Sequence, residues 1–236
     1  MTSVCYTPLK LTTVRVTKVD VNCGGAVTGT CSTAVTNSVV SVAMTKEYED
    51  RQEFFVTNGN GDFCVKETNP PKLKWINLVA TFCDVEPELL NIMTSEPLVA
   101  DDSAAAKYTG FSTQEGTAAL ASFAMEGWTR VSGLSIPCTG TNVEYGYVLW
   151  PWIVEGTVGD ITHENNTVSF VVNGRTRSGS QWGVGPYFVD LSDNTGTLNA
   201  PIKLLTSIGS TQHHRMFLTR QAPPTASCGC SPLFAA

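Results

Sequence analysis

The sequence is poor in charge, because Asp, Glu, Lys and Arg together make up 15% of its 236 residues, against about 25% in an average soluble domain. Its 21 acidic and 15 basic residues leave a net charge of −6. This sign argues against wrapping around nucleic acid phosphates, whereas a negative surface lets DNA pass without adhering. So few charges predict a surface that is covered in large part either by other copies of the chain or by polar Thr, Ser and Asn side chains.

Long apolar runs are also lacking. No segment approaches the roughly 18 apolar residues that a membrane-spanning helix needs. The first residues show no basic patch followed by an apolar stretch, so we expect no secretory signal. This predicts synthesis in a cytosol and no membrane partner.

Histidines number three, at His163, His213 and His214. His163 is expected in a solvated loop, and neighbouring residues on a strand point to opposite faces, so His213 and His214 are not expected to share a metal. The sequence contains no nucleophile elbow, P-loop, dinucleotide fingerprint, zinc-protease motif or calcium loop. We therefore expect no catalytic residue, no cofactor and no metal, and predict that the protein is not an enzyme.

Cysteines are eight in number, well below the density of a disulfide scaffold. Cys23 and Cys31 bracket a glycine-rich stretch and could face each other across a hairpin. A disulfide between them is one interpretation, and two small buried thiols is the other.

Strand patterns dominate what is present. Apolar and polar residues alternate over 76–82, 119–125 and 145–149, which is typical of half-buried strands. The run over 168–172 leads into Asn173–Gly174, a strong hairpin-turn signal. At least eight strands with short connections predict a mainly β fold, a sandwich or a barrel.

One helix is predicted at about residues 85–95, with Pro87 in its first turn and an apolar stripe that ends at Met93. It should lie against the sheet. We expect a single β domain over residues 1–221 and an extended C-terminal arm over 222–236.

Two polar segments are the candidate contact regions. Residues 46–69 form a predicted long loop, and loops of that length tend to be functional or ordered by a partner. The expected interface residues are Phe54 and Phe55, with Asn58 and Asn60 at the tip. Pro223 and Pro224 in the C-terminal arm complete this prediction.

Arg175 and Arg177 should lie on one side of a strand. They form either an ordinary polar face or a contact to an acidic neighbouring subunit. The aromatic clusters around Trp150–Trp152 and Trp182–Phe188 are either strand ends in the core or an apolar interface anchor.

Three motifs together resemble the major tail proteins of long-tailed, non-contractile phages (siphophages) of actinobacteria. They are the strand-to-helix junction Phe82–Leu90, the segment Asn173–Thr176 with Trp182–Val189, and the ending from Pro223 to Cys230. They occur in the order of that family over roughly residues 60–230.

This resemblance implies a tail tube subunit with a β-sandwich or barrel-like fold and one flanking helix. Such subunits form rings, commonly hexameric, that stack into a hollow tube through which genomic DNA passes without specific binding. The implied partners are other copies of the chain, the tape measure protein, and tail terminator and distal tail proteins. The implied location is the virion tail, assembled in the host bacterial cytoplasm.

Two other functions stay open at this point. One is a different virion structural protein, such as a capsid decoration or tail terminator protein. The other is a carbohydrate-binding β-sandwich or a hydrolase on such a scaffold, which a soluble monomer with a sugar-dependent melting temperature would indicate.

Overall fold

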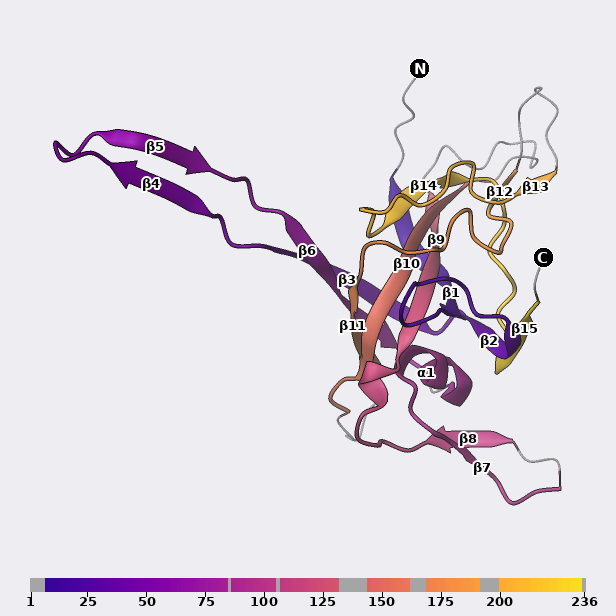
Figure 1. Cartoon of the computed structure of the whole chain (residues 1–236). Helices are drawn as coiled ribbons and strands as arrows, with labels where there is room; N and C mark the ends of the chain where they lie inside the picture. Colours follow the sequence, from indigo (N-terminus) through magenta and orange to yellow (C-terminus); the bar gives the residue numbers. More distant parts are fainter. Residues whose placement is uncertain are drawn as a thin grey trace.

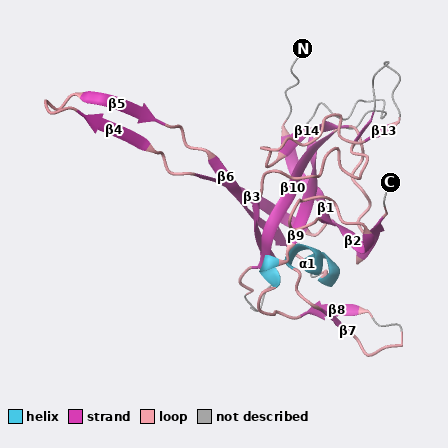
Figure 2. Cartoon of the chain, in the orientation of Figure 1, coloured by secondary structure: helices cyan, strands magenta, loops and turns pink. Residues whose placement is uncertain are grey.

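One antiparallel sheet of nine strands organises the chain (Figures 1 and 2). The computed structural model describes residues 7–84, 86–104, 107–131, 144–161, 169–191 and 200–234. The elements are β1 (Pro8–Lys18), β2 (Gly29–Thr36), β3 (Val39–Tyr48), β4 (Glu53–Thr57), β5 (Phe63–Thr68), β6 (Leu73–Phe82), α1 (Pro87–Thr94), β7 (Leu98–Ala100), β8 (Tyr108–Phe111), a short 3-10 helix (Thr117–Ala119), β9 (Ser122–Val131), β10 (Tyr145–Val158), β11 (Phe170–Thr176), β12 (Asp190–Leu191), β13 (Pro201–Ile202), β14 (Arg215–Thr219) and β15 (Cys230–Leu233). The prediction of a mainly β fold is confirmed.

The strands of the large sheet follow the order β15-β2-β1-β9-β10-β11-β6-β3, and β14 pairs with the first half of β10. The sheet is strongly curled, because β1 and β3 contact each other although four strands separate them in this order. Two further strand pairs, β4–β5 and β7–β8, project from the body as hairpins (Figure 1). The projecting hairpins are therefore separate from the main sheet.

The two central strands, β9 and β10, are buried on both faces. On one face Val148 and Trp150 belong to the core that includes the helix residues. On the other, Tyr147 and Leu149 pack in a second core with Trp182. Near-continuous burial of this kind produces an apolar run rather than strict alternation, as the sequence of β10 shows.

The helix α1 lies within the predicted range and packs against β1, β2, β9 and β10. Its residues Leu89, Leu90, Ile92 and Met93 are all buried. It ends at Ser95, whose left-handed φ of 58° lets its N–H reach the Asn91 carbonyl. The apolar stripe of α1 thus packs against the sheet, as the sequence pattern predicts.

The hairpin turn predicted at Asn173–Gly174 is wrong. Both residues lie inside β11, where Asn173 pairs with Val79 of β6 and Gly174 with Leu78. A Cβ on Gly174 would come within 2.7 Å of Ile153 Cγ2 on β10. Glycine is needed here for the close approach of two strands and not for a turn.

The predicted disulfide between Cys23 and Cys31 is also wrong. Cys31 on β2 bonds instead to Cys230 on β15, 199 positions away, with the two Cα atoms 5.1 Å apart. The thiol of Cys23 donates to Asp20 Oδ1 at 3.2 Å. A contact between strands that are adjacent only in the folded sheet has no local sequence signal.

Two predicted segments have more structure than expected. The loop 46–69 is the end of β3 followed by the hairpin β4–β5. The predicted C-terminal arm over 222–236 does not extend away from the body in its described part, residues 222–234, because Cys230 and Ser231 pair with Ala34 and Thr33 of β2. The strand β15 thus completes one edge of the sheet.

Candidate assembly surface

The most prominent surface feature is the hairpin formed by residues 49–72, here called the arm (Figure 1). It continues the direction of β3 and β6 and projects far from the body. Every residue from 49 to 72 is exposed. The arm therefore has almost no contact with the chain that carries it.

The arm exposes large apolar side chains on both faces. Strand register places Phe55 opposite Lys66, and Thr57 opposite Phe63, on one face. The rings of Phe55 and Phe63 lie 5.7 Å apart, and Lys66 Nζ lies 6.0 and 5.8 Å from their centres. We call this side the lysine-covered face.

The opposite side, here called the Glu67 face, carries Phe54, Val56, Val65 and Glu67. Phe54 pairs with Glu67 and Val56 with Val65, so the four side chains form one patch. Phe54, Val56 and Val65 are 54%, 55% and 49% exposed. A patch of this kind on a soluble protein indicates an interaction site.

The tip of the arm is a tight turn held by Asn58. Its Oδ1 accepts hydrogen bonds from the N–H groups of Asn60 at 3.0 Å and Asp62 at 2.9 Å. Gly61 adopts a left-handed φ of 88°, which glycine permits without strain. Of the two predicted interface asparagines, Asn58 therefore shapes the turn, whereas the exposed Asn60 is available to a partner.

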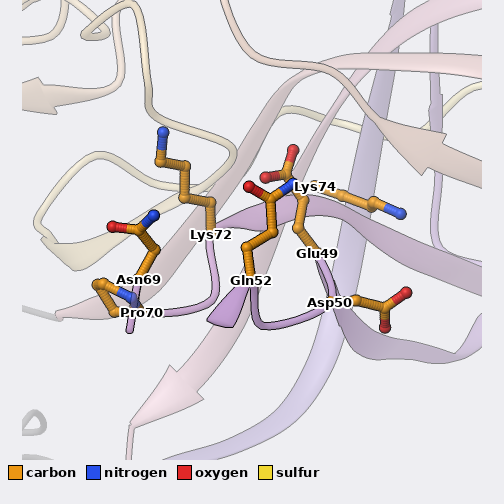
Figure 3. A pocket seen from close by; sticks show the side chains of 7 residues that line it. All are labelled: Glu49, Asp50, Gln52, Asn69, Pro70, Lys72 and Lys74. Atoms are coloured by element: carbon orange, nitrogen blue, oxygen red, sulfur yellow. The ribbon is translucent and has the colours of Figure 1, made fainter. Parts of the chain in front are cut away.

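The root of the arm is an open polar pocket of about 650 Å³ (Figure 3). Backbone hydrogen bonds close the root, from Glu49 N–H to the Lys72 carbonyl at 2.8 Å and from Asn69 N–H to the Gln52 carbonyl at 3.1 Å. The side chains point in different directions, and no ion pair joins them. The lining residues are Glu49, Asp50, Gln52, Asn69, Pro70, Lys72 and Lys74. This arrangement offers charges to a partner rather than enclosing a ligand.

The two ends of the main sheet differ. At one end β15 is short, contains Pro232 and is tied to β2 by the Cys31–Cys230 disulfide, features that blunt an edge. At the other end β3 pairs only with β6 among the described strands. Its ten residues include the exposed side chains Val40, Met44 and Tyr48. Such an edge can add a strand from another chain.

Arg175 and Arg177 both lie at the surface beside β6 and β10. Arg175 forms an ion pair with Glu155 and stacks over Trp75 at 4.8 Å. Arg177 stacks over Trp152 at 4.7 Å. The structure thus places the two predicted residues close together. Each of them also contacts side chains of its own subunit.

Pro223 and Pro224 are half-buried, and Pro223 lines a surface pocket of about 790 Å³ with Val39 and Tyr145. Both prolines pack on the body, and in the sequence they lie far from the arm.

The histidines His213 and His214 lie partly or fully inside the body. His213 is buried with its Nδ1 2.8 Å from Thr176 Oγ1, and His214 is half-buried. Burial lowers the pKa of both histidines. His163 lies outside the described residues.

A buried network of charged and polar side chains joins β1, β9 and β10, and no sequence motif predicts it. The guanidinium of Arg15 donates to both carboxylate oxygens of Glu126, at 2.6 and 2.7 Å, and the Tyr147 hydroxyl donates to the same carboxylate at 2.6 Å. Arg15 also stacks over Tyr187 at 3.4 Å. Burial raises the pKa of Tyr147 well above its usual value, and the neighbouring Glu126 charge adds to this. This network ties the irregular segment around Tyr187 to β1 and β9.

Glu86, just before α1, is a second polar group of note. Burial raises the pKa of its carboxyl, against the effect of the hydrogen bond that Thr36 donates to Oε1. Its other oxygen is buried and without a hydrogen-bond partner among the described residues. The cost of burying the ionised Glu86 carboxylate is therefore poorly offset by hydrogen bonds.

Three apolar arm residues were missed as interface candidates, namely Val56, Phe63 and Val65. The alternation over Phe63–Val65 was a usable signal, but the surrounding Gly, Asn and charged residues favoured a loop.

Within the described residues no group of three or more His, Cys, Asp or Glu side chains could hold a metal ion, and no helix there is long and apolar enough to cross a membrane.

A scan against protein-family models matches none of them, and a search of curated proteins finds no match either. Function is therefore to be inferred from the arm, the open sheet edge and the charge of this chain.

Proposed function

We propose that this chain is a structural subunit of a tail tube of a non-contractile phage, and that it acts by assembling with copies of itself rather than by catalysis. The observation that carries the proposal is the arm, a projecting hairpin with large apolar side chains exposed on both faces. An isolated two-stranded hairpin is marginally stable in water. A covering partner would stabilise it by burying these side chains.

The dimensions of the arm suit contact between successive copies. Residues 49–60 form one limb, and twelve residues span about 40 Å at roughly 3.3 Å each. The remaining roughly 200 residues have an expected radius of gyration of about 17 Å, and so a diameter of about 40–45 Å. An arm of one copy is thus long enough to reach across the body of the next.

The arm and its receiving surface are different parts of the molecule, so the contact is heterologous. Heterologous contacts generate rings if the rotation closes and filaments if it does not. The open edge of β3 provides a second contact, through main-chain hydrogen bonds to a strand of a neighbouring copy. Two such contacts support stacked rings, which we propose to be hexameric.

The net charge of −6 supports the same function. A tube built from acidic subunits repels the phosphate backbone, so DNA would pass through without specific binding. We propose the tape measure protein as occupant before DNA ejection, the tail terminator and distal tail proteins as partners at the ends, and the virion tail as the location.

The proposal is tested by removing the arm. Glu49 and Lys72 are hydrogen-bonded neighbours, so replacing residues 50–71 by an Asn-Gly turn closes the hairpin at its root. The variant should keep the thermal unfolding midpoint of the unassembled protein and sediment as a monomer at concentrations where the full chain assembles. Assembly of the variant at the same concentrations as the full chain would contradict the proposal.

A further inference from the structure

The body carries a cationic pocket whose charges are incompletely neutralised. It is lined by Lys74, Arg175 and Arg177, by the half-buried ring of Trp75 and by a single acid, Glu155, and has a volume of about 420 Å³. Glu155 is paired with Arg175. No carboxylate lies within ion-pair distance of Lys74 or Arg177 in the part of the chain that the structure describes.

Aromatic rings hold these cations in place. Arg175 and Lys74 lie over Trp75 at 4.8 and 5.7 Å from the ring centre, and Arg177 lies over Trp152 at 4.7 Å. Stacking on a ring fixes the plane of a guanidinium and leaves its N–H edge free to bind a carboxylate. The pocket therefore fits a partner that combines a carboxylate with apolar side chains.

The Glu67 face of the arm has this composition. Glu67 lies beside Phe54, with Val56 and Val65 following on the same face. On the lysine-covered face, Lys66 already lies over the rings of Phe55 and Phe63. The Glu67 face thus has the uncovered apolar surface and a charge opposite to that of the pocket.

We propose that the cationic pocket of one copy receives the Glu67 face of the arm of a second copy, with the Glu67 carboxylate bound between Lys74 and Arg177. This inference rests on the proposed function, because it names the receiving surface for the arm. Phe54 then packs beside Trp75, and the interface contains a desolvated charge pair that selects the register of the arm.

The test is a charge exchange in the full chain, followed by sedimentation velocity over a concentration series. Glu67→Lys and Arg177→Glu should each raise the concentration needed for assembly by about tenfold or more. The double variant should regain most of the loss, because the pair is restored with reversed sign. Glu53→Lys is the matched control, since Glu53 lies on the lysine-covered face of β4, the strand paired with the one that carries Glu67, and its change should leave assembly unaltered.

Arg177 also stacks on Trp152, so Lys74→Glu provides a second pocket variant that does not touch that ring. Wild-type-like assembly of the Glu67 and Lys74 variants would overturn this inference, even where the armless variant remains monomeric and the proposed function stands. Equal effects of Glu67→Lys and Glu53→Lys would overturn it too. A full chain that never assembles would remove both the proposed function and this inference.

Discussion

The apolar patch on the Glu67 face allows a quantitative prediction for the triple change Phe54→Ser, Val56→Thr and Val65→Thr. About half of each side chain is exposed, at 54%, 55% and 49%. Full burial of such a side chain contributes about 1.5–3 kcal/mol, so covering the exposed half contributes about 1 kcal/mol. Three side chains give about 3 kcal/mol per arm, or a factor of about 100 in the association constant.

The assay is light scattering against protein concentration, combined with thermal unfolding of the unassembled protein. The triple variant should need about 100-fold more protein to assemble, while its unfolding midpoint should not change, because the arm makes few contacts with its own body. Leu205→Ser is the matched control, since Leu205 is an 80% exposed apolar residue of the body. A drop of several degrees in the midpoint, or unchanged assembly, would refute the reasoning.

The remaining predictions concern the body. Glu126→Gln leaves Arg15 buried without a counter-charge and should cost about 3–5 kcal/mol in denaturant unfolding; an added Arg15→Met should recover part of this, and no cost would contradict the buried pair. Burial raises the pKa of Glu86 in the folded state above its value in the unfolded state. Stability is therefore lost as the pH rises from the unfolded-state pKa to the folded-state pKa of this carboxyl. Glu86→Gln should therefore raise the melting temperature at pH 7 and have little effect below the usual glutamate pKa; a lower melting temperature at pH 7 would be the contrary result. Trp182→Ala should cost about 3–5 kcal/mol, since the side chain is 6% exposed in the core, and an unchanged midpoint would contradict that burial.

Elements governed by local pattern could be predicted from the sequence. The stripe from Leu89 to Met93 identified α1, and the alternation over 76–82 identified β6. In both cases one face is buried, so the burial period matches the period of the element.

Features decided by distant contacts could not be predicted. Gly174 has the same sequence context as a hairpin glycine, and only its 2.7 Å approach to Ile153 shows that it serves close strand packing. The partner of Cys31 is 199 residues away, beyond any local signal. The Arg15–Glu126 pair likewise depends on the alignment of β1 with β9.

The segment 46–69 differs from its prediction in secondary structure. The sequence predicts a loop there, because a hairpin exposed on both faces lacks the clean polar and apolar alternation of a half-buried strand, and its role in contacts stays a prediction. Phe54 and Phe55 are indeed exposed on the arm. Their separation onto opposite faces follows from the register with β5, and it is this separation that distinguishes the two faces.

Negative-stain electron microscopy of the purified full chain tests the central claim most directly. The exposed arm and the open edge of β3 predict hollow, stacked rings whose number grows with protein concentration. Uniform particles of monomer size at every concentration would contradict the account.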